Sequence, residues 1–197
     1  MSGGTTVADL AARVLAAGPR LGNTRLVCVD GPAGSGKTTV AERLIGALEG
    51  TAELVHMDDL YAGWTLTGAV ARLSAGVLRP LAEGRAGGYH RYDWAAGRFG
   101  VELVGVPVAE VLVVEGCGSS PRALDAWTTL RIWVEAPLAV RLRRGLARDG
   151  AVLEPEWRAW QRIEAAEFAR EDTRARADLW VDGSGAGPPG ASVQQSR

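Results

Sequence analysis

Residues 31–38 read Gly-Pro-Ala-Gly-Ser-Gly-Lys-Thr and fit the pattern G-x-x-x-x-G-K-T. The apolar run 26–29 precedes this segment, and apolar residues at helical spacing follow it from Val40 to Leu48. A glycine-rich loop between a strand and a helix start turns its backbone N–H groups toward one point, where they can bind phosphate oxygens. The segment therefore predicts a strand–loop–helix unit with a phosphate-binding loop.

The residues of this loop divide into a backbone cradle and two functional side chains. The cradle is expected to consist of Gly31, Ala33, Gly34, Ser35, Gly36, Lys37, Thr38 and Thr39. Lys37 can reach the β and γ phosphates of a nucleoside triphosphate, and the Thr38 hydroxyl can bind Mg²⁺. A glycine-rich turn with a chance lysine is the alternative, but the strand-like and helical flanks argue against it.

Composition limits where such a chain acts. The formal net charge of −1 provides no general attraction for nucleic acids or anionic membranes. No run approaches the ~20 apolar residues of a membrane span, and the N-terminus lacks the pattern of a signal peptide. Cys28 and Cys117 form no disulfide framework, which suits a reducing compartment. We expect a cytoplasmic protein whose partners include neither nucleic acid nor membrane.

Short apolar segments alternate with amphipathic ones along the chain. The expected strands are 26–30, 52–57, 111–114, 130–134 and 179–181. The expected helices are 7–15, 38–49, 66–77 (with Pro80 disturbing its end), 138–148 and 156–174. This alternation predicts an α/β fold of three layers, αβα, around a mostly parallel five-stranded sheet. Residues 89–94 are expected to be extended or looped, 1–182 to form one domain, and 183–197 to be a disordered tail.

Acidic residues follow two of the predicted strands. Glu115 ends the strand at 111–114, and Asp58 and Asp59 follow the strand at 52–57. Parallel α/β sheets bind ligands beyond the carboxyl ends of their strands, so these acids are expected near Lys37. Glu115 and Asp58 are candidate Mg²⁺ ligands beside Thr38, and Asp58 is preferred over Asp59 as the base for an acceptor hydroxyl. The alternatives are a solvated carboxylate at Glu115 and a turn-capping role for one of the two aspartates.

Arginines recur on the helix expected at 138–148. Arg141, Arg144 and Arg148 share one face because they are three, four and seven positions apart. Such a row could bind the phosphoryl group during transfer, with Arg144 and Arg148 as catalytic candidates. The alternative is an arginine-rich solvent face.

Aromatic residues lie close to the acids in loop-like segments. Tyr61, Trp64, Tyr92 and Trp94 could form walls for a planar group, and Asp93 could bind its polar edge. The tryptophans in strand or helix contexts are expected to serve packing instead; they are Trp133, Trp157, Trp160 and Trp180.

Together these motifs resemble the uridine–cytidine kinase group of P-loop kinases, which are relatives of pantothenate kinase and phosphoribulokinase. The matching segments are the phosphate loop, His-Met-Asp-Asp-Leu-Tyr at 56–61, Tyr-Asp-Trp at 92–94, Glu-Gly at 115–116, the arginines of 141–149 and Ala-Asp-Leu at 177–179. The resemblance implies a P-loop kinase fold with a short lid, ATP and Mg²⁺ as cofactors, and a small-molecule acceptor. It also implies that Asp58 is the base, that Tyr61 lines the acceptor site and that Glu115 supports Mg²⁺.

The chain departs from that group in the acceptor half. Residues 95–98 lack the histidine that reads the pyrimidine, and residues 62–66 lack the ribose-binding acid. Arg98 could bind an anionic group instead. We expect an ATP-dependent kinase for a hydroxyl of a nucleoside or nucleoside-like compound. The alternatives are a kinase for a phosphate- or carboxylate-bearing metabolite and a nucleotide-gated ATPase or regulatory module. Related enzymes often form dimers or tetramers, so a homo-oligomer is compatible with the resemblance.

Overall fold

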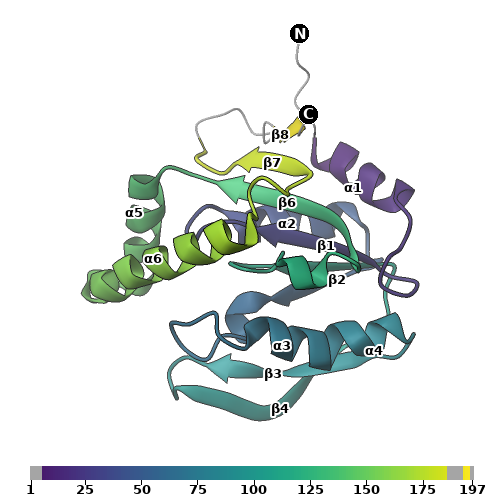
Figure 1. Cartoon of the computed structure of the whole chain (residues 1–197), viewed down its shortest axis with the longest axis horizontal. Helices are drawn as coiled ribbons and strands as arrows, with labels where there is room; N and C mark the ends of the chain where they lie inside the picture. The colour runs from purple at the N-terminus through teal and green to yellow at the C-terminus, as the bar shows by residue number, and fades with distance from the viewer. Residues whose placement is uncertain (1–5, 186–192, 196–197) are drawn as a thin grey trace.

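The computed structural model describes residues 6–185 and the backbone of residues 193–195 (Figure 1). Its central sheet contains five parallel strands, as the alternation of apolar and amphipathic segments predicts. In spatial order these are β2 (Ala52–His56), β5 (Val111–Glu115), β1 (Arg25–Asp30), β6 (Thr128–Glu135) and β7 (Leu179–Asp182). A sixth strand, β8 (Val193–Gln195), pairs antiparallel with β7.

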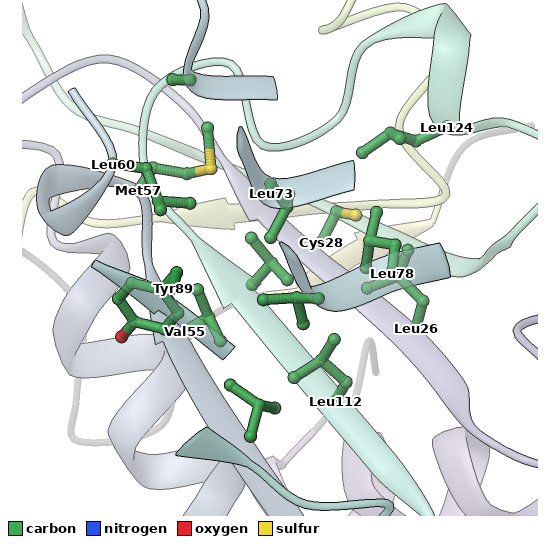
Figure 2. Packing of buried hydrophobic residues seen from close by; sticks show 14 of the residues in the cluster. Leu26, Cys28, Val55, Met57, Leu60, Leu73, Leu78, Tyr89, Leu112 and Leu124 are labelled. Atoms are coloured by element: carbon green, nitrogen blue, oxygen red, sulfur yellow. The ribbon is translucent and has the colours of Figure 1, made fainter. Parts of the chain in front are cut away.

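Alternation along β1 divides the core into two halves. Val27 and Val29 face a cluster that includes α1 (Val7–Ala16) and α2 (Lys37–Ala47). Leu26 and Cys28 face the opposite cluster, part of which is drawn in Figure 2. Because successive strand side chains point to opposite faces, a strand that is apolar at both sets of positions must be covered on both sides. The chain is therefore a three-layer α/β structure.

The second face of the sheet is covered by a helical segment, a hairpin and a long helix. The helical segment comprises α3 (Ala69–Leu73), the π-helical turn η2 (Ser74–Leu78) and α4 (Arg79–Ala82). The sequence predicted that Pro80 disturbs the end of this helix, and the α-helical geometry is indeed interrupted by the π-helical turn that directly precedes Arg79 and Pro80. The long helix is α6 (Glu154–Glu171), which lies beside α5 (Leu138–Asp149) in Figure 1.

An antiparallel hairpin of β3 (Gly87–Asp93) and β4 (Arg98–Val106) forms a separate two-stranded sheet. The sequence suggested extended or looped chain at 89–94 but did not predict β4. The hairpin contacts the core through Tyr89 and Val106, while Val101 is 93% exposed. Because β4 places apolar side chains in solvent, its pattern does not mark a core strand.

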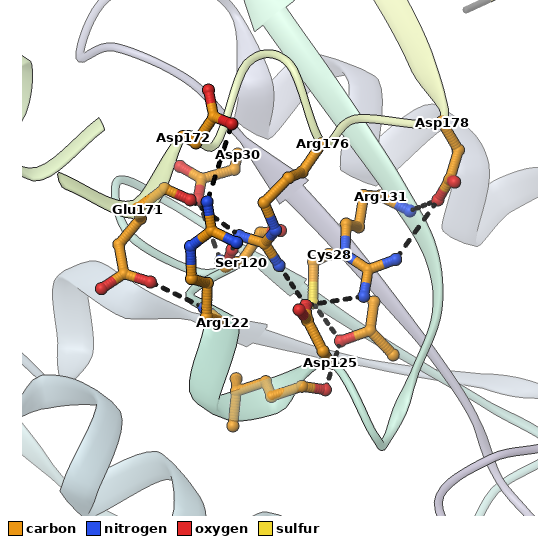
Figure 3. A network of polar contacts seen from close by, with 12 residues as sticks. Cys28, Asp30, Ser120, Arg122, Asp125, Arg131, Glu171, Asp172, Arg176 and Asp178 are labelled. Carbon is orange, nitrogen blue, oxygen red and sulfur yellow. Dashed lines mark hydrogen bonds and ion pairs between the residues drawn. The ribbon is translucent and has the colours of Figure 1, made fainter. Parts of the chain in front are cut away.

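A polar network joins the start of β6 to the segment between α6 and β7 (Figure 3). Arg131 of β6 forms ion pairs with Asp125 and Asp178, and Arg176 also pairs with Asp125. These side chains lie away from the carboxyl edge of the sheet, so we assign them to the fold rather than to a site.

The region beyond residue 182 differs in part from the expected disordered tail. Residues 193–195 form β8, because the free edge of β7 offers unpaired backbone groups. Residues 186–192 and 196–197 lie outside the described residues. None of the helices in the described part of the chain is long and apolar enough to cross a membrane.

Candidate active site

A cavity of about 760 Å³ opens at the carboxyl edge of the sheet. Register explains why its parts meet there, since Glu115 pairs with both Val29 and His56 at the ends of three neighbouring strands. The lining residues are Ala33, Gly34, Gly36, Lys37, Thr38, Thr39, Asp58, Tyr61, Trp64, Trp94, Glu115, Cys117, Arg144, Gly145, Arg148, Asp149, Leu153, Trp157 and Trp160. The phosphate loop and the strand-end acids thus face one cavity.

The phosphate loop has backbone angles and close contacts that require glycine. Gly31, Gly34 and Gly36 have φ values of +143°, +77° and +100°. A Cβ atom at Gly31 would lie 2.1 Å from the carbonyl oxygen of Val134, and one at Gly34 would lie 2.6 Å from that of Arg141. Since α2 begins at Lys37, its first backbone N–H groups and its positive dipole end lie at the loop.

Lys37 is a buried cation beside several acids. Its Nζ atom donates a hydrogen bond to the Pro32 carbonyl oxygen at 3.0 Å and lies 3.7 Å from Cys117 Sγ. Burial alone would lower the pKa of Lys37, but nearby negative groups, among them Glu115 and Asp58, raise it above its ordinary value. Lys37 therefore remains charged at the base of the cavity.

Thr38, Glu115 and His56 form a chain of hydrogen bonds. The Thr38 hydroxyl donates to Glu115 Oε1 at 3.1 Å, and His56 Nδ1 lies 2.6 Å from the same oxygen. The bond to Glu115 raises the pKa of His56, so this ring is a donor that holds the carboxylate in place. A hydroxyl and carboxylates are the hard oxygen donors that Mg²⁺ prefers, so Thr38, Glu115 and the neighbouring Asp58 fit this ion. Sequence reasoning gave His56 no such role.

The two adjacent aspartates have different surroundings. Asp58 is open to the cavity, where burial among the walls and the Glu115 carboxylate raise its pKa. Asp59 instead accepts a hydrogen bond from the Tyr89 hydroxyl at 3.0 Å and pairs with Arg91 Nε at 3.0 Å. Asp58 is thus available to a ligand, whereas Asp59 holds β3.

Two arginines of α5, Arg144 and Arg148, line the cavity and have different hydrogen-bond partners, whereas Arg141 does not line it. Arg144 donates to the carbonyl oxygens of Gly34, Gly183 and Ser184 at 3.2, 2.7 and 2.9 Å. Arg148 pairs with Asp149 and lies over the Trp157 ring, 5.7 Å from its centre. Arg144 therefore joins the phosphate loop to the segment after β7, and Arg148 is the more exposed cation of the two.

Aromatic side chains form one wall of the cavity. Trp64 contacts Trp94, Trp157 and Trp160 edge-on, at centroid distances of 5.8, 6.1 and 6.0 Å. Trp94 is 45% exposed, and its indole N–H donates to the Asp58 carbonyl oxygen at 3.2 Å. Tyr61 is fully buried, with its hydroxyl donating to the Cys117 carbonyl oxygen at 2.8 Å. The wall thus consists of Trp64 and Trp94 together with Trp157 and Trp160 of α6.

Three predicted acceptor residues lie elsewhere. Tyr92, Asp93 and Arg98 line a second, open groove on the hairpin, to which Trp94 also contributes. Asp93 Oδ1 accepts from the backbone N–H groups of Ala95 and Ala96, so this carboxylate stabilises the hairpin turn. The structure therefore brings Tyr61, Trp64 and Trp94 to the cavity, but not Tyr92, Asp93 and Arg98.

Several lining residues were not singled out from the sequence. Cys117 follows β5, and the sequence indicated only that it belongs to no disulfide framework, while Trp157 and Trp160 were expected to serve packing. Their spacing of three places both indoles on one face of α6, which is the signal that could have linked them to a shared wall. Asp149 accepts from the Trp157 indole N–H at 3.0 Å and closes this side of the cavity.

The sequence matches no protein-family model and no curated protein. Solved structures nevertheless share its architecture. A protein from Bacillus stearothermophilus described as a possible uridine kinase has a TM-score of 0.63 at 19% identity, covering 88% of this chain and 96% of its own.

Two further structures show the same likeness. A candidate fructose transport system kinase from Silicibacter sp. TM1040 has a TM-score of 0.58 at 23% identity and covers 83% of this chain and 96% of its own. D-glycerate 3-kinase from Cryptococcus neoformans has a TM-score of 0.55 at 14% identity and covers 98% of this chain and all of its own. At these identities the likeness concerns the fold. The chain has the fold of the P-loop kinases.

Proposed function

We propose that this protein is an ATP- and Mg²⁺-dependent kinase that transfers the γ-phosphoryl group to a hydroxyl of a small molecule. One observation carries the proposal: Lys37, Thr38, Glu115 and Asp58 line a single cavity together with an aromatic wall. Phosphoryl transfer requires mainly alignment and charge neutralisation, and these residue types supply both.

Each polar residue has a distinct role in this proposal. The loop N–H groups and Lys37 bind the phosphates, and Thr38 and Glu115 hold Mg²⁺ with Asp58 beside it. When bound, Mg²⁺ neutralises the charge that develops on the transferring group. Asp58 orients the acceptor hydroxyl and accepts its proton, since its carboxylate is open to the cavity. Arg148 adds positive charge from α5.

The acceptor is bound beside the aromatic wall. Trp64 and Trp94 offer indole surface next to Asp58, which suits a planar or apolar group on the acceptor. A nucleoside-like compound remains our best single candidate. Arg98 lies in the separate hairpin groove, so the alternative of a phosphate- or carboxylate-bearing acceptor loses the anchor on which it rested.

An acceptor screen tests the proposed activity. Wild-type protein is incubated with Mg²⁺, γ-labelled ATP and a panel of nucleosides, amino alcohols, sugars and hydroxy acids. We expect transfer to at least one acceptor to exceed transfer to water. Lys37→Ala should abolish most of this transfer, while Arg43→Ala, an exposed change on the same helix, should not. ATP hydrolysis with no acceptor in the panel would favour a nucleotide-gated regulatory module instead.

A further inference from the structure

Glu164 is a buried carboxylate on α6 with partners from three other parts of the chain. Only 1% of this residue is exposed. Oε2 accepts a hydrogen bond from the Ala33 backbone N–H at 2.8 Å and another from Cys117 Sγ at 3.3 Å. Oε1 pairs with Arg141 Nη1 of α5 at 2.8 Å. Burying a carboxylate costs several kcal/mol unless such partners compensate, so this arrangement needs an explanation.

The position of Glu164 relates the phosphate loop to the cavity wall. Trp157, Trp160 and Glu164 share one face of α6, because they are three and four positions apart. The two indoles line the cavity, whereas the Glu164 carboxylate contacts the loop behind it. A fixed bond at Glu164 therefore fixes how far the aromatic wall lies from the loop.

The same carboxylate relates the loop to α5. The Arg141 guanidinium group has a second partner, since its Nε atom also donates to the Ala136 carbonyl oxygen at 3.0 Å. The Arg141 backbone touches Gly34 so closely that a Cβ atom there would lie 2.6 Å from the Arg141 carbonyl oxygen. Arg148 lies about two helical turns farther along α5. The bond between Arg141 and Glu164 thus helps to fix the placement of α5 and, with it, the position of Arg148 at the cavity.

We propose that Glu164 is a positioning residue that joins the phosphate loop to α5 and α6 and thereby aligns Arg148 and the aromatic wall with the bound phosphates. This inference rests on the proposed kinase function. Glu164 is not among the residues that line the cavity, so it acts through Ala33 and Arg141. Its loss should therefore affect the rate of transfer more than the binding of ATP.

Substitutions that keep or remove the buried charge pair test this role. Glu164→Gln and Arg141→Met should each lower the melting temperature, because each leaves one buried charge without its partner. Each should also lower kcat about tenfold to a hundredfold while the KM for ATP changes much less, as expected from misalignment of reacting groups. Glu167→Gln, which removes an exposed ion pair on the same helix, is the matched control and should change neither quantity.

The double variant Glu164→Gln/Arg141→Met separates alignment from stability. Without either charge, it should recover much of the melting temperature, yet its kcat should stay as low as that of the single variants. Recovery of kcat together with the melting temperature would overturn the proposal, and so would a wild-type kcat in Glu164→Gln.

Nucleotide binding gives a readout that does not require the acceptor. Upon addition of Mg²⁺ and ADP, amide hydrogen exchange should slow in both the phosphate loop and α5 of the wild type, but only in the loop of Glu164→Gln. If amide exchange in α5 slowed equally in both proteins, this would contradict the role of Glu164 but not the proposed kinase function. A wild type that binds no nucleotide would contradict the proposed function, and the inference with it.

Discussion

Neighbouring carboxylates in this chain have different tasks because their partners differ. Asp58 faces the cavity near Lys37, while Asp59 is bound by Tyr89 and Arg91 of the hairpin. The sequence predicted that both acids follow the carboxyl end of a strand, as they do in the structure. It could not separate them by local pattern alone, because the hairpin partners lie some 30 residues away.

The two aspartates provide a matched pair of variants. Asp58→Asn should lower kcat about a hundredfold or more with ATP affinity largely kept, because it removes a general base without changing side-chain size. Asp59→Asn should lower the melting temperature, since it weakens the bonds to Tyr89 and Arg91, and should leave kcat nearly unchanged. Steady-state kinetics and thermal unfolding check both results. The reverse pattern would show that Asp59 is the base.

Asp30 connects β1 to the segment after β5. Its carboxylate accepts hydrogen bonds from the backbone N–H groups of Gly31, Gly118 and Ser120 at 2.7, 2.9 and 2.9 Å. Burial nevertheless raises the pKa of Asp30 to about 6. A raised folded-state pKa means that the protonated form is favoured by folding. The stabilisation that the protonated Asp30 carboxyl group provides is therefore fully present below about pH 4 and is lost as the pH rises through 6.

This shift predicts a pH-dependent difference between wild type and Asp30→Asn. A difference of roughly 2 pH units between folded and unfolded states corresponds to about 3 kcal/mol. Between about pH 4 and pH 6.5, the unfolding free energy of the wild type should therefore fall relative to that of the variant by up to this amount. Urea unfolding at a series of pH values measures the difference. Parallel pH profiles would contradict the assignment.

At the scale of elements, α5 and α6 meet at a contact that only glycine allows. A Cβ atom at Gly145 would lie 2.4 Å from Cζ2 of Trp157, which is shorter than the closest approach of two non-bonded carbon atoms. Trp157 is 1% exposed and packs against Trp64 at a centroid distance of 6.1 Å, so an added methyl group would force the indole or one of the two helices to shift. The close approach therefore fixes the distance between the two helices that flank the cavity.

Gly145→Ala should separate α5 from α6. We expect a loss of about 1–3 kcal/mol in unfolding free energy, which is typical of overpacking a buried contact. Gly46→Ala is the control, because a Cβ atom there meets nothing within 4 Å. This second change should leave stability the same or raise it by up to about 1 kcal/mol, since alanine is the better helix former. Urea unfolding distinguishes the two, and equal effects would contradict the account of the contact.

Elements with a strong local pattern could be predicted, and those that depend on distant partners could not. The phosphate loop and the five parallel strands follow from glycine spacing and continuous apolar runs. Strand β4 was missed because Val101 and Leu103 face solvent, so the apolar positions of this strand do not mark a buried face. Glu164 was missed because its acceptor role depends on Ala33, 131 positions earlier, and nothing in the local sequence of α6 indicates that contact.

At the scale of the whole molecule, the cavity exists only when the sheet is complete. The loop after β1, the turn after β2 and the end of β5 supply its polar floor, whereas the segment before α3, the hairpin turn and α6 supply its aromatic wall. The strand order β2-β5-β1-β6-β7 places the first three of these strands side by side. Segments that are distant in sequence thus reach one edge, which is the general location of ligand sites in open α/β sheets.

The most direct test of this account uses Lys37, the only lysine in the 197-residue sequence. A small amine-acylating reagent is applied at high pH, where part of the Lys37 amine is unprotonated, and the amino terminus of the protein serves as an internal reference. Mass spectrometry then gives the ratio of the two modifications with and without Mg²⁺ and ATP. If the phosphates bind in the cavity, the nucleotide should protect Lys37 and leave the amino terminus unaffected. Modification of Lys37 that is substantial in the free protein and equally strong with saturating nucleotide would contradict the account.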